Sequence, residues 1–176
     1  MQRMDAFLKA LATPGSRIGG GSVAALSAAA SAALLEKLVS GSQQGRRLSA
    51  VRRECSQLIF RDAEVFSGVV DALRKKDRAG FAAALKRSNA VQWRVFQHAA
   101  HLERACEATK DRINPAYRSD LICAYAAAKA SALAAEALIL ANASWLGSPS
   151  YLSASRKRLD RVRKNVAYAH GKAKQR

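Results

Sequence analysis

Apolar residues recur along most of this chain at alternating spacings of three and four, which places them on one face of an α-helix. The clearest such face lies between residues 46 and 75 and consists of Leu48, Val51, Cys55, Leu58, Asp62, Val65, Val69 and Leu73. Runs rich in Val, Ile or Thr, from which strands are usually built, do not occur. The pattern therefore predicts an all-α protein.

Glycine, proline and capping residues divide this pattern into six helices. We expect the helices at about residues 2–11, 22–39, 46–75, 77–110, 119–145 and 149–168, with Ser22, Asp77 and Ser119 as N-caps. Short turns between long helices favour antiparallel packing. The sequence predicts a six-helix antiparallel bundle in a single domain, residues 1–176, that ends in a basic C-terminal helix, residues 150–176.

The second and fifth predicted helices are rich in alanine and apolar on nearly all sides. Such a helix must be covered by its neighbours over most of its surface. Six helices can cover one helix of this kind more easily than two. We therefore expect a homodimer in which these two helices supply much of the interface.

The composition favours a soluble, cytoplasmic protein. Apolar residues make up 49% of the chain but aromatic residues only 6%, and alanine, the best helix former, supplies much of the difference. The apolar segments 23–35 and 121–146 run into or contain charged residues, so we expect neither to span a membrane. Because Cys55, Cys106 and Cys123 lack metal-ligand spacing, we expect reduced, buried thiols and no metal.

The net charge of +17 arises from 30 Lys and Arg side chains against 13 Asp and Glu side chains. Residues 151–176 alone carry nine basic side chains against one Asp. Such a balance favours an anionic partner, namely nucleic acid, a membrane surface or a polyanionic small molecule. A solvated basic face is the alternative, because no aromatic residues stand between the basic positions as stacking platforms for bases.

Asp62 is the first candidate for chemistry. It lies on an apolar helix face, where burial would raise the pKa of its carboxyl toward a value useful for acid/base catalysis. The alternatives are pairing with an arginine, such as Arg61 of a neighbouring chain, or drift of this face into water. If the third and fourth helices form an antiparallel hairpin that turns near Asp77, equal rise places Gln92 opposite Asp62. This polar pair predicts either a site or a simple buried hydrogen bond.

The turn Gly19-Gly20-Gly21-Ser22 is the second candidate. Three glycines before a helix expose backbone N–H groups at the positive helix end, which suits an anion or a carbonyl oxygen. The alternative is a tight turn that lets two helices approach closely. Asp120 follows the predicted cap in the first turn of the fifth helix, and on its own it indicates only a helix start.

Four segments resemble, in order, the signatures of the formimidoyltetrahydrofolate cyclodeaminase and methenyltetrahydrofolate cyclohydrolase family. Thr13-Pro14-Gly15 and then Gly19 to Leu26 resemble its Pro-Gly-Gly-Gly-Ser-Val-Ala-Ala signature, and Asp62 to Phe66 resembles its Asp-Ala-Glu-Ala-Phe segment. Asn114-Pro115 with Ser119-Asp120-Leu121 resembles its Asn-Pro…Ser-Asp-Leu turn, and Asn142 falls where the family keeps an Asn late in the fifth helix. The resemblance extends from Phe7 to about Trp145.

The resemblance implies an all-α dimer that binds tetrahydrofolate derivatives, without a metal, in a groove near the interface. The implied reaction opens or closes the methenyl bridge between N5 and N10. In the cyclohydrolase reaction water adds to the methenyl carbon and one C–N bond breaks. In the cyclodeaminase reaction N10 attacks the formimino carbon and ammonia leaves. Both reactions need a general acid/base beside a tetrahedral intermediate.

The resemblance also implies roles for individual residues. Asp62 would be the acid/base, and Asp120 would contact or orient the pterin or the water. The glycine turn, Gly19, Gly20 and Gly21, would hold the substrate together with Ser22, and Asn142 would supply a polar contact. We also expect Ser119 and Gln92 among the substrate-binding residues, Gln92 because of its predicted place opposite Asp62.

Two functions stay open from the sequence. The first is a folate one-carbon enzyme, with the cyclohydrolase favoured over the cyclodeaminase because no formiminotransferase domain is attached. The second is a family member without catalysis that serves as a basic interaction module and binds nucleic acid through its tail. Asp62 and Asp120 favour the enzyme, whereas the inserted Ser16-Arg17-Ile18 and the basic tail favour the module.

Overall fold

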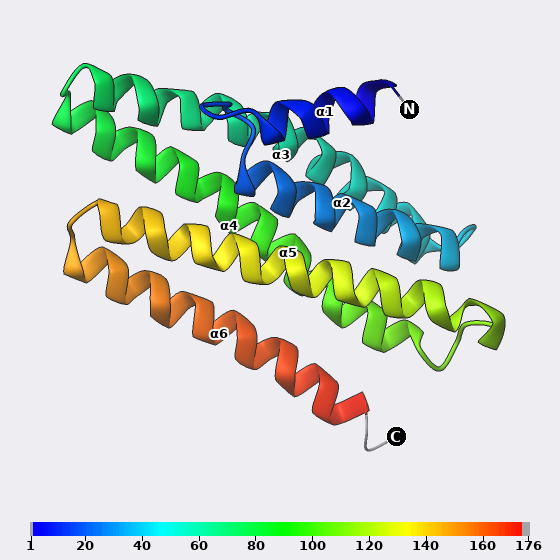
Figure 1. The fold of residues 1–176 in the computed structure, drawn as a ribbon. Helices are drawn as coiled ribbons and strands as arrows, with labels where there is room; N and C mark the ends of the chain where they lie inside the picture. Colours follow the sequence, from blue (N-terminus) through cyan, green and yellow to red (C-terminus); the bar gives the residue numbers. More distant parts are fainter. Residues whose placement is uncertain (1, 174–176) are drawn as a thin grey trace.

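The computed structural model describes the backbone of residues 2–173 and the side-chain surroundings of residues 4–166. Met1 and residues 174–176, the end of the predicted basic segment, lie outside the described residues. The elements are α1 (Gln2–Ala12), α2 (Gly20–Leu38), α3 (Gln43–Arg74), α4 (Arg78–Thr109), the 3-10 helix η1 (Pro115–Tyr117), α5 (Arg118–Trp145) and α6 (Pro149–Ala173) (Figure 1). The described residues contain no strand, so the prediction of an all-α fold with six α-helices is confirmed.

The long helices form an antiparallel bundle with α4 at its centre. Figure 1 shows α3, α4, α5 and α6 in succession across the bundle, and α2 packs between α3 and α5. Helix α4 contacts all four of these helices. Helix α4, which is not one of the two alanine-rich helices, therefore has the most α-helix neighbours in the bundle.

Alanine and serine let α2 and α5 approach closely in opposite directions. The hydroxyl of Ser31 in α2 donates to the Ala124 carbonyl at 2.7 Å, and that of Ser131 in α5 donates to the Ala24 carbonyl at 2.8 Å. Both serines are buried, so these bonds satisfy hydroxyl groups that would otherwise lose hydration without compensation. Small side chains thus fix the pairing of these helices.

The outer surface of α2 and α5 is only partly covered within one chain. In the most apolar 18-residue window, 50% of α2 and 33% of α5 is buried. Both are long and apolar enough to cross a membrane by length and composition, but core helices pass the same test. One chain therefore leaves part of both helices uncovered, and the homodimer stays a prediction.

The helix starts differ from the prediction at two of the three expected caps. Asp77 caps α4, and its carboxylate accepts from the Gly80 N–H at 2.9 Å as predicted. The prediction was wrong for Ser22, because α2 already begins at Gly20 and the Ser22 hydroxyl turns inward to the neighbouring helix α3. It was also wrong for Ser119, because the Asn114 side chain and η1 turn the chain into the helix before that residue.

Two predicted core residues lie at the surface. Leu73 is 64% exposed and Ala72 is buried in its place. A straight helix has 3.6 residues per turn, so a face with a repeat of 3.5 drifts around the helix over the length of α3. Cys55 and Cys106 are buried as expected, but Cys123 is exposed on α5, and all three cysteines are free.

Candidate functional site

The candidate site lies where the first turn of α2 meets α3 and α4. Helix α3 places Asp62 on its inward face, and α4 places Gln92 opposite this carboxyl. Asp62 is 6% exposed and Gln92 is 1% exposed. The Gln92 Nε2 donates to Asp62 Oδ1 at 2.7 Å, which confirms the pairing predicted from the equal rise of the hairpin.

Ser22 supplies the second polar contact to Asp62. Its Oγ lies 2.8 Å from the Ile59 carbonyl oxygen and 3.2 Å from Asp62 Oδ2. A hydroxyl has a single proton, so Ser22 can donate to only one of these oxygens at a time. When it donates to Ile59, its oxygen can accept a hydrogen bond from the protonated Asp62 carboxyl. The serine therefore suits both the ionised and the protonated carboxyl.

Burial raises the pKa of the Asp62 carboxyl above its ordinary value. Hydrogen bonds from Ser22 and Gln92 offset part of this effect because they stabilise the ionised form. The sequence analysis considered an arginine such as Arg61 of a neighbouring chain as a partner of Asp62. In this chain Arg61 pairs with Glu64 of its own helix at 2.6 Å. Asp62 is therefore a desolvated carboxyl held by neutral groups, an arrangement that suits a group that exchanges protons during a reaction.

Gly21 is required by close packing against this pair. A Cβ at this position would lie 2.5 Å from Asp62 Cγ and closer still to Asp62 Oδ1 and Gln92 Nε2. A Cβ at Gly20 would meet only Leu138 at 3.9 Å, and a Cβ at Gly19 would meet nothing within 4 Å. At Gly21 the geometry thus favours the close-approach interpretation of the glycine turn.

Polar residues continue from Gln92 along α4. One turn earlier, Ser88 accepts a hydrogen bond at 3.2 Å from the Nδ2 of Asn142, which extends from α5. The neighbouring Asn89 donates to the Ile139 carbonyl at 3.3 Å, and its Oδ1 is buried without a partner among the described side chains. Sequence reasoning missed Ser88 and Asn89. Their signal is the four-residue spacing between Ser88 and Gln92 on a face that is otherwise apolar.

Asp120 lies far from Asp62 within the chain. Its carboxylate forms an ion pair with Lys37 at 2.8 Å, near the end of α2 opposite to Ser22. Fifteen residues separate Ser22 from Lys37, which corresponds to about 22 Å of helix. Ser119 precedes Asp120 at the same end. One chain therefore brings together Asp62, Gln92, Gly21 and Ser22, with Asn142 nearby, but neither Ser119 nor Asp120.

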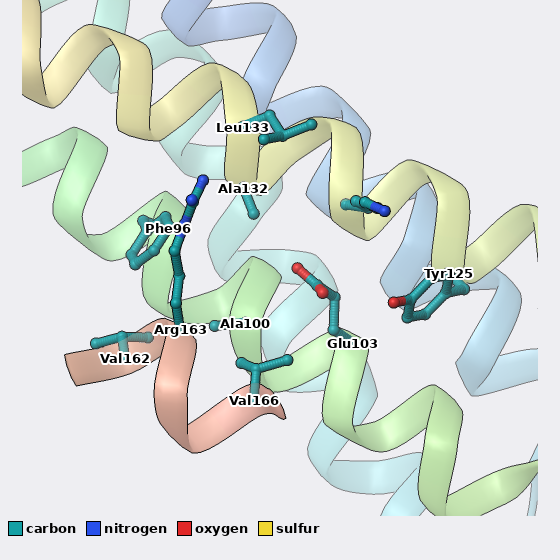
Figure 2. Close-up of a pocket in the computed structure, with 10 residues that line it drawn as sticks. Phe96, Ala100, Glu103, Tyr125, Ala132, Leu133, Val162, Arg163 and Val166 are labelled. Atoms are coloured by element: carbon teal, nitrogen blue, oxygen red, sulfur yellow. The ribbon is translucent and has the colours of Figure 1, made fainter. Parts of the chain in front are cut away.

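A separate cavity of about 460 Å³ lies between α4, α5 and α6 (Figure 2). Its walls are mainly apolar and include Phe96 and Ala100 of α4, Ala132 of α5 and Val162 of α6. None of the predicted site residues lines it. Within residues 4–166, no group of three or more His, Cys, Asp or Glu side chains is arranged to hold a metal ion.

Comparisons with known proteins show what this fold is similar to. The model of the formiminotransferase-cyclodeaminase family matches residues 3–161. Among solved structures, the formiminotetrahydrofolate cyclodeaminase from Thermotoga maritima has a TM-score of 0.86 and 18% sequence identity, with 98% of this chain and 93% of that chain covered. At this identity the likeness to the solved structure concerns the fold alone. No curated protein matches.

Proposed function

This chain belongs to the formiminotransferase-cyclodeaminase family, and on that premise we propose that it is a folate one-carbon enzyme acting between N5 and N10 of tetrahydrofolate. The family match spans the four motifs that carried the resemblance. The observation that carries the proposal is the Asp62 carboxyl, buried among neutral hydrogen-bond partners at the first turn of α2.

Asp62 serves in this proposal as the general acid/base. When N10 attacks the formimino carbon, a tetrahedral intermediate forms, and the N10 proton must leave while the departing amine gains one. A single carboxyl can accept the first proton and donate the second, and ammonia then leaves as the methenyl bridge closes. The raised pKa of Asp62 supports this role, because the group must exist in both protonation states during turnover.

The cyclodeaminase reaction is our first candidate, because the names of the family and of the Thermotoga maritima protein both refer to it. The cyclohydrolase reaction, which the sequence analysis placed first, is the second candidate and finds no support in either name. In that reaction Asp62 would take a proton from water and give it to the departing nitrogen.

The test is to supply 5-formiminotetrahydrofolate and 5,10-methenyltetrahydrofolate separately and to follow the absorbance of the methenyl group. Formation of methenyl from the first substrate supports the cyclodeaminase, and accelerated decay of the second supports the cyclohydrolase. If neither rate exceeds that in buffer, the enzyme proposal is wrong for these substrates.

The proposed assembly is a homodimer through the outer face of α2 and α5. Ile122 and Leu133 of α5 are 63% and 52% exposed, with alanines 126 and 130 between them at helical spacing, although Leu133 also lines the cavity between α4, α5 and α6. A two-fold axis crossing the middle of this face reverses the helix direction in the second copy. It thereby places Asp120 of the partner subunit near the first turn of α2, which gives Ser119 and Asp120 their proposed roles.

Subunit mixing tests this arrangement. Asp62→Asn and Asp120→Asn are each expected to lack activity as homodimers. Random mixing makes half of the molecules heterodimers with one intact site of two, so the mixture should regain about one quarter of wild-type activity. A mixture that stays inactive although it exchanges subunits contradicts a site shared between protomers.

The nucleic-acid alternative and the cytoplasmic location stay predictions. Part of the positive charge of α6 has a role inside the chain, because the Arg158 guanidinium lies 4.1 Å from the centre of the Trp93 ring and Arg163 pairs with Glu136. Neither contact favours a nucleic-acid partner, and we propose no nucleic-acid function.

A further inference from the structure

Gln92 contacts the Asp62 carboxyl through only one end of its amide. Nε2 donates to Asp62 Oδ1 at 2.7 Å, whereas Oε1 is buried and has no hydrogen-bond partner among the described residues. The side chain is almost completely enclosed, with buried Val91 and Val95 beside it on α4. An unpaired buried acceptor is costly, so this arrangement calls for a physical explanation.

An acid/base needs different partners in its two protonation states. An ionised carboxyl accepts hydrogen bonds, whereas a protonated carboxyl also donates one. A primary amide can serve both states, because a half-turn of its terminal group exchanges N–H₂ and C=O with almost no change of shape. In either orientation one amide atom pairs with Asp62 and the other stays unpaired, so the cost of the unpaired atom is similar in both states.

The groups that face Asp62 are almost all neutral, so few of them besides Gln92 can affect the protonation of its carboxyl. Helix α2 presents Gly21 and Ser22, α4 presents Gln92, and neither helix places a charged side chain in contact with the carboxyl. On α3 itself, the nearby charges of Arg61 and Glu64 pair with each other at the surface. Among the described residues, neutral hydrogen bonds thus offset the effect of burial.

We propose that Gln92 is a positioning residue that holds Asp62 Oδ1 in both protonation states by turning its amide, and so eases the exchange of a proton at this carboxyl. This inference rests on the proposed role of Asp62 as acid/base. It assigns Gln92 to the carboxyl, and not to direct binding of the substrate as the sequence analysis expected.

The experiment compares Gln92→Met with Gln92→Glu, and uses Gln97→Met, at an exposed position of the same helix, as the matched control. The titration of the Asp62 carboxyl carbon is followed by ¹³C NMR in the ligand-free protein, and its signal is assigned by its loss in Asp62→Asn. The pH dependence of kcat and KM is measured in parallel, and circular dichroism checks that each variant is folded.

Gln92→Met should move the Asp62 titration to higher pH, because the hydrogen bond lost from the ionised carboxyl is charge-assisted and therefore stronger than the one lost from the protonated carboxyl. At a fixed pH within the titration, the ratio of protonated to ionised Asp62 should rise about tenfold. Gln92→Glu keeps the size of the side chain and adds a second carboxyl, so the pair should titrate in two separated steps. The control should leave the titration unchanged.

A titration that does not move in Gln92→Met overturns the inference, and a raised KM with an unchanged pH profile then assigns Gln92 to substrate binding. If Gln92→Met does not fold, a single-step titration in Gln92→Glu overturns it instead. The proposed function fails separately. Wild type without turnover but with a Gln92-dependent titration contradicts the enzyme, whereas turnover with an unmoved titration contradicts only the role of Gln92.

Discussion

Replacement of Gly21 by alanine tests how closely α2 is packed against the candidate site. The added Cβ would lie 2.5 Å from Asp62 Cγ, whereas ordinary van der Waals contact begins at about 3.4 Å. Forcing a methyl group into such a space costs about 1–3 kcal/mol, and loss of a hydrogen bond to a charged group costs about 1.5–3 kcal/mol. The substitution should therefore both destabilise the protein and displace Asp62.

Gly20→Ala is the matched control, because the same methyl group would meet only Leu138 at 3.9 Å. Both substitutions change the conformational entropy of a glycine in the first turn of α2, so this effect largely cancels in their difference. We expect Gly21→Ala to be less stable than Gly20→Ala by at least about 2 kcal/mol. For a chain of this size this corresponds to a Tm lower by roughly 4–8 °C.

Chemical denaturation followed by circular dichroism measures the difference between these two variants. A second comparison in an Asp62→Ala background removes the carboxyl that the methyl group would meet. The destabilisation by Gly21→Ala should then become smaller, because the contact with Asp62 is gone and only the Gln92 amide still lies in the way of the methyl group. Equal stability of Gly21→Ala and Gly20→Ala, or an undiminished difference in the Asp62→Ala background, would refute this packing argument.

Three further predictions concern separate features of the chain. The pKa of Asp62 is raised in the folded state, so its contribution to stability is complete below the ordinary Asp pKa and is lost as pH rises through the folded pKa. Asp62→Asn should therefore gain stability relative to wild type over that rise in pH. Chemical denaturation at several pH values measures this difference. Burial raises the pKa of Cys55 and Cys106 to about 12, so a thiol reagent should label exposed Cys123 first in the native protein, and uniform labelling would contradict this. Asp77→Ala should lower the free energy of unfolding by about 1 kcal/mol in chemical denaturation, because it removes the N-cap of α4. The contacts between α2 and α5 should stay unchanged.

The period of the apolar residues was sufficient to predict the helices and one important contact. Asp62 and Gln92 lie at equal distances along the chain from Asp77, so a hairpin turn at Asp77 was enough to place them opposite each other. This inference needed only helical rise and a turn, both of which are local properties.

Features that depend on contacts between distant segments could not be predicted in the same way. Serine is a typical N-cap residue, but the hydroxyl of Ser22 donates a hydrogen bond to the carbonyl of Ile59 on α3. Likewise, Asp120 belongs to a helix whose pairing with α2 places it beside Lys37, away from Asp62. Periodicity indicates which face of a helix is buried, but it does not identify the helix that covers that face.

The chemical step with purified Asp62→Asn provides the decisive measurement. Under single-turnover conditions with 5-formiminotetrahydrofolate, wild type should form the methenyl product. Asp62→Asn, folded and saturated with the same substrate, should be slower by about 10²–10⁴-fold, the usual contribution of a general acid/base. A rate equal to that of wild type would contradict the assignment of Asp62 as the acid/base of this protein.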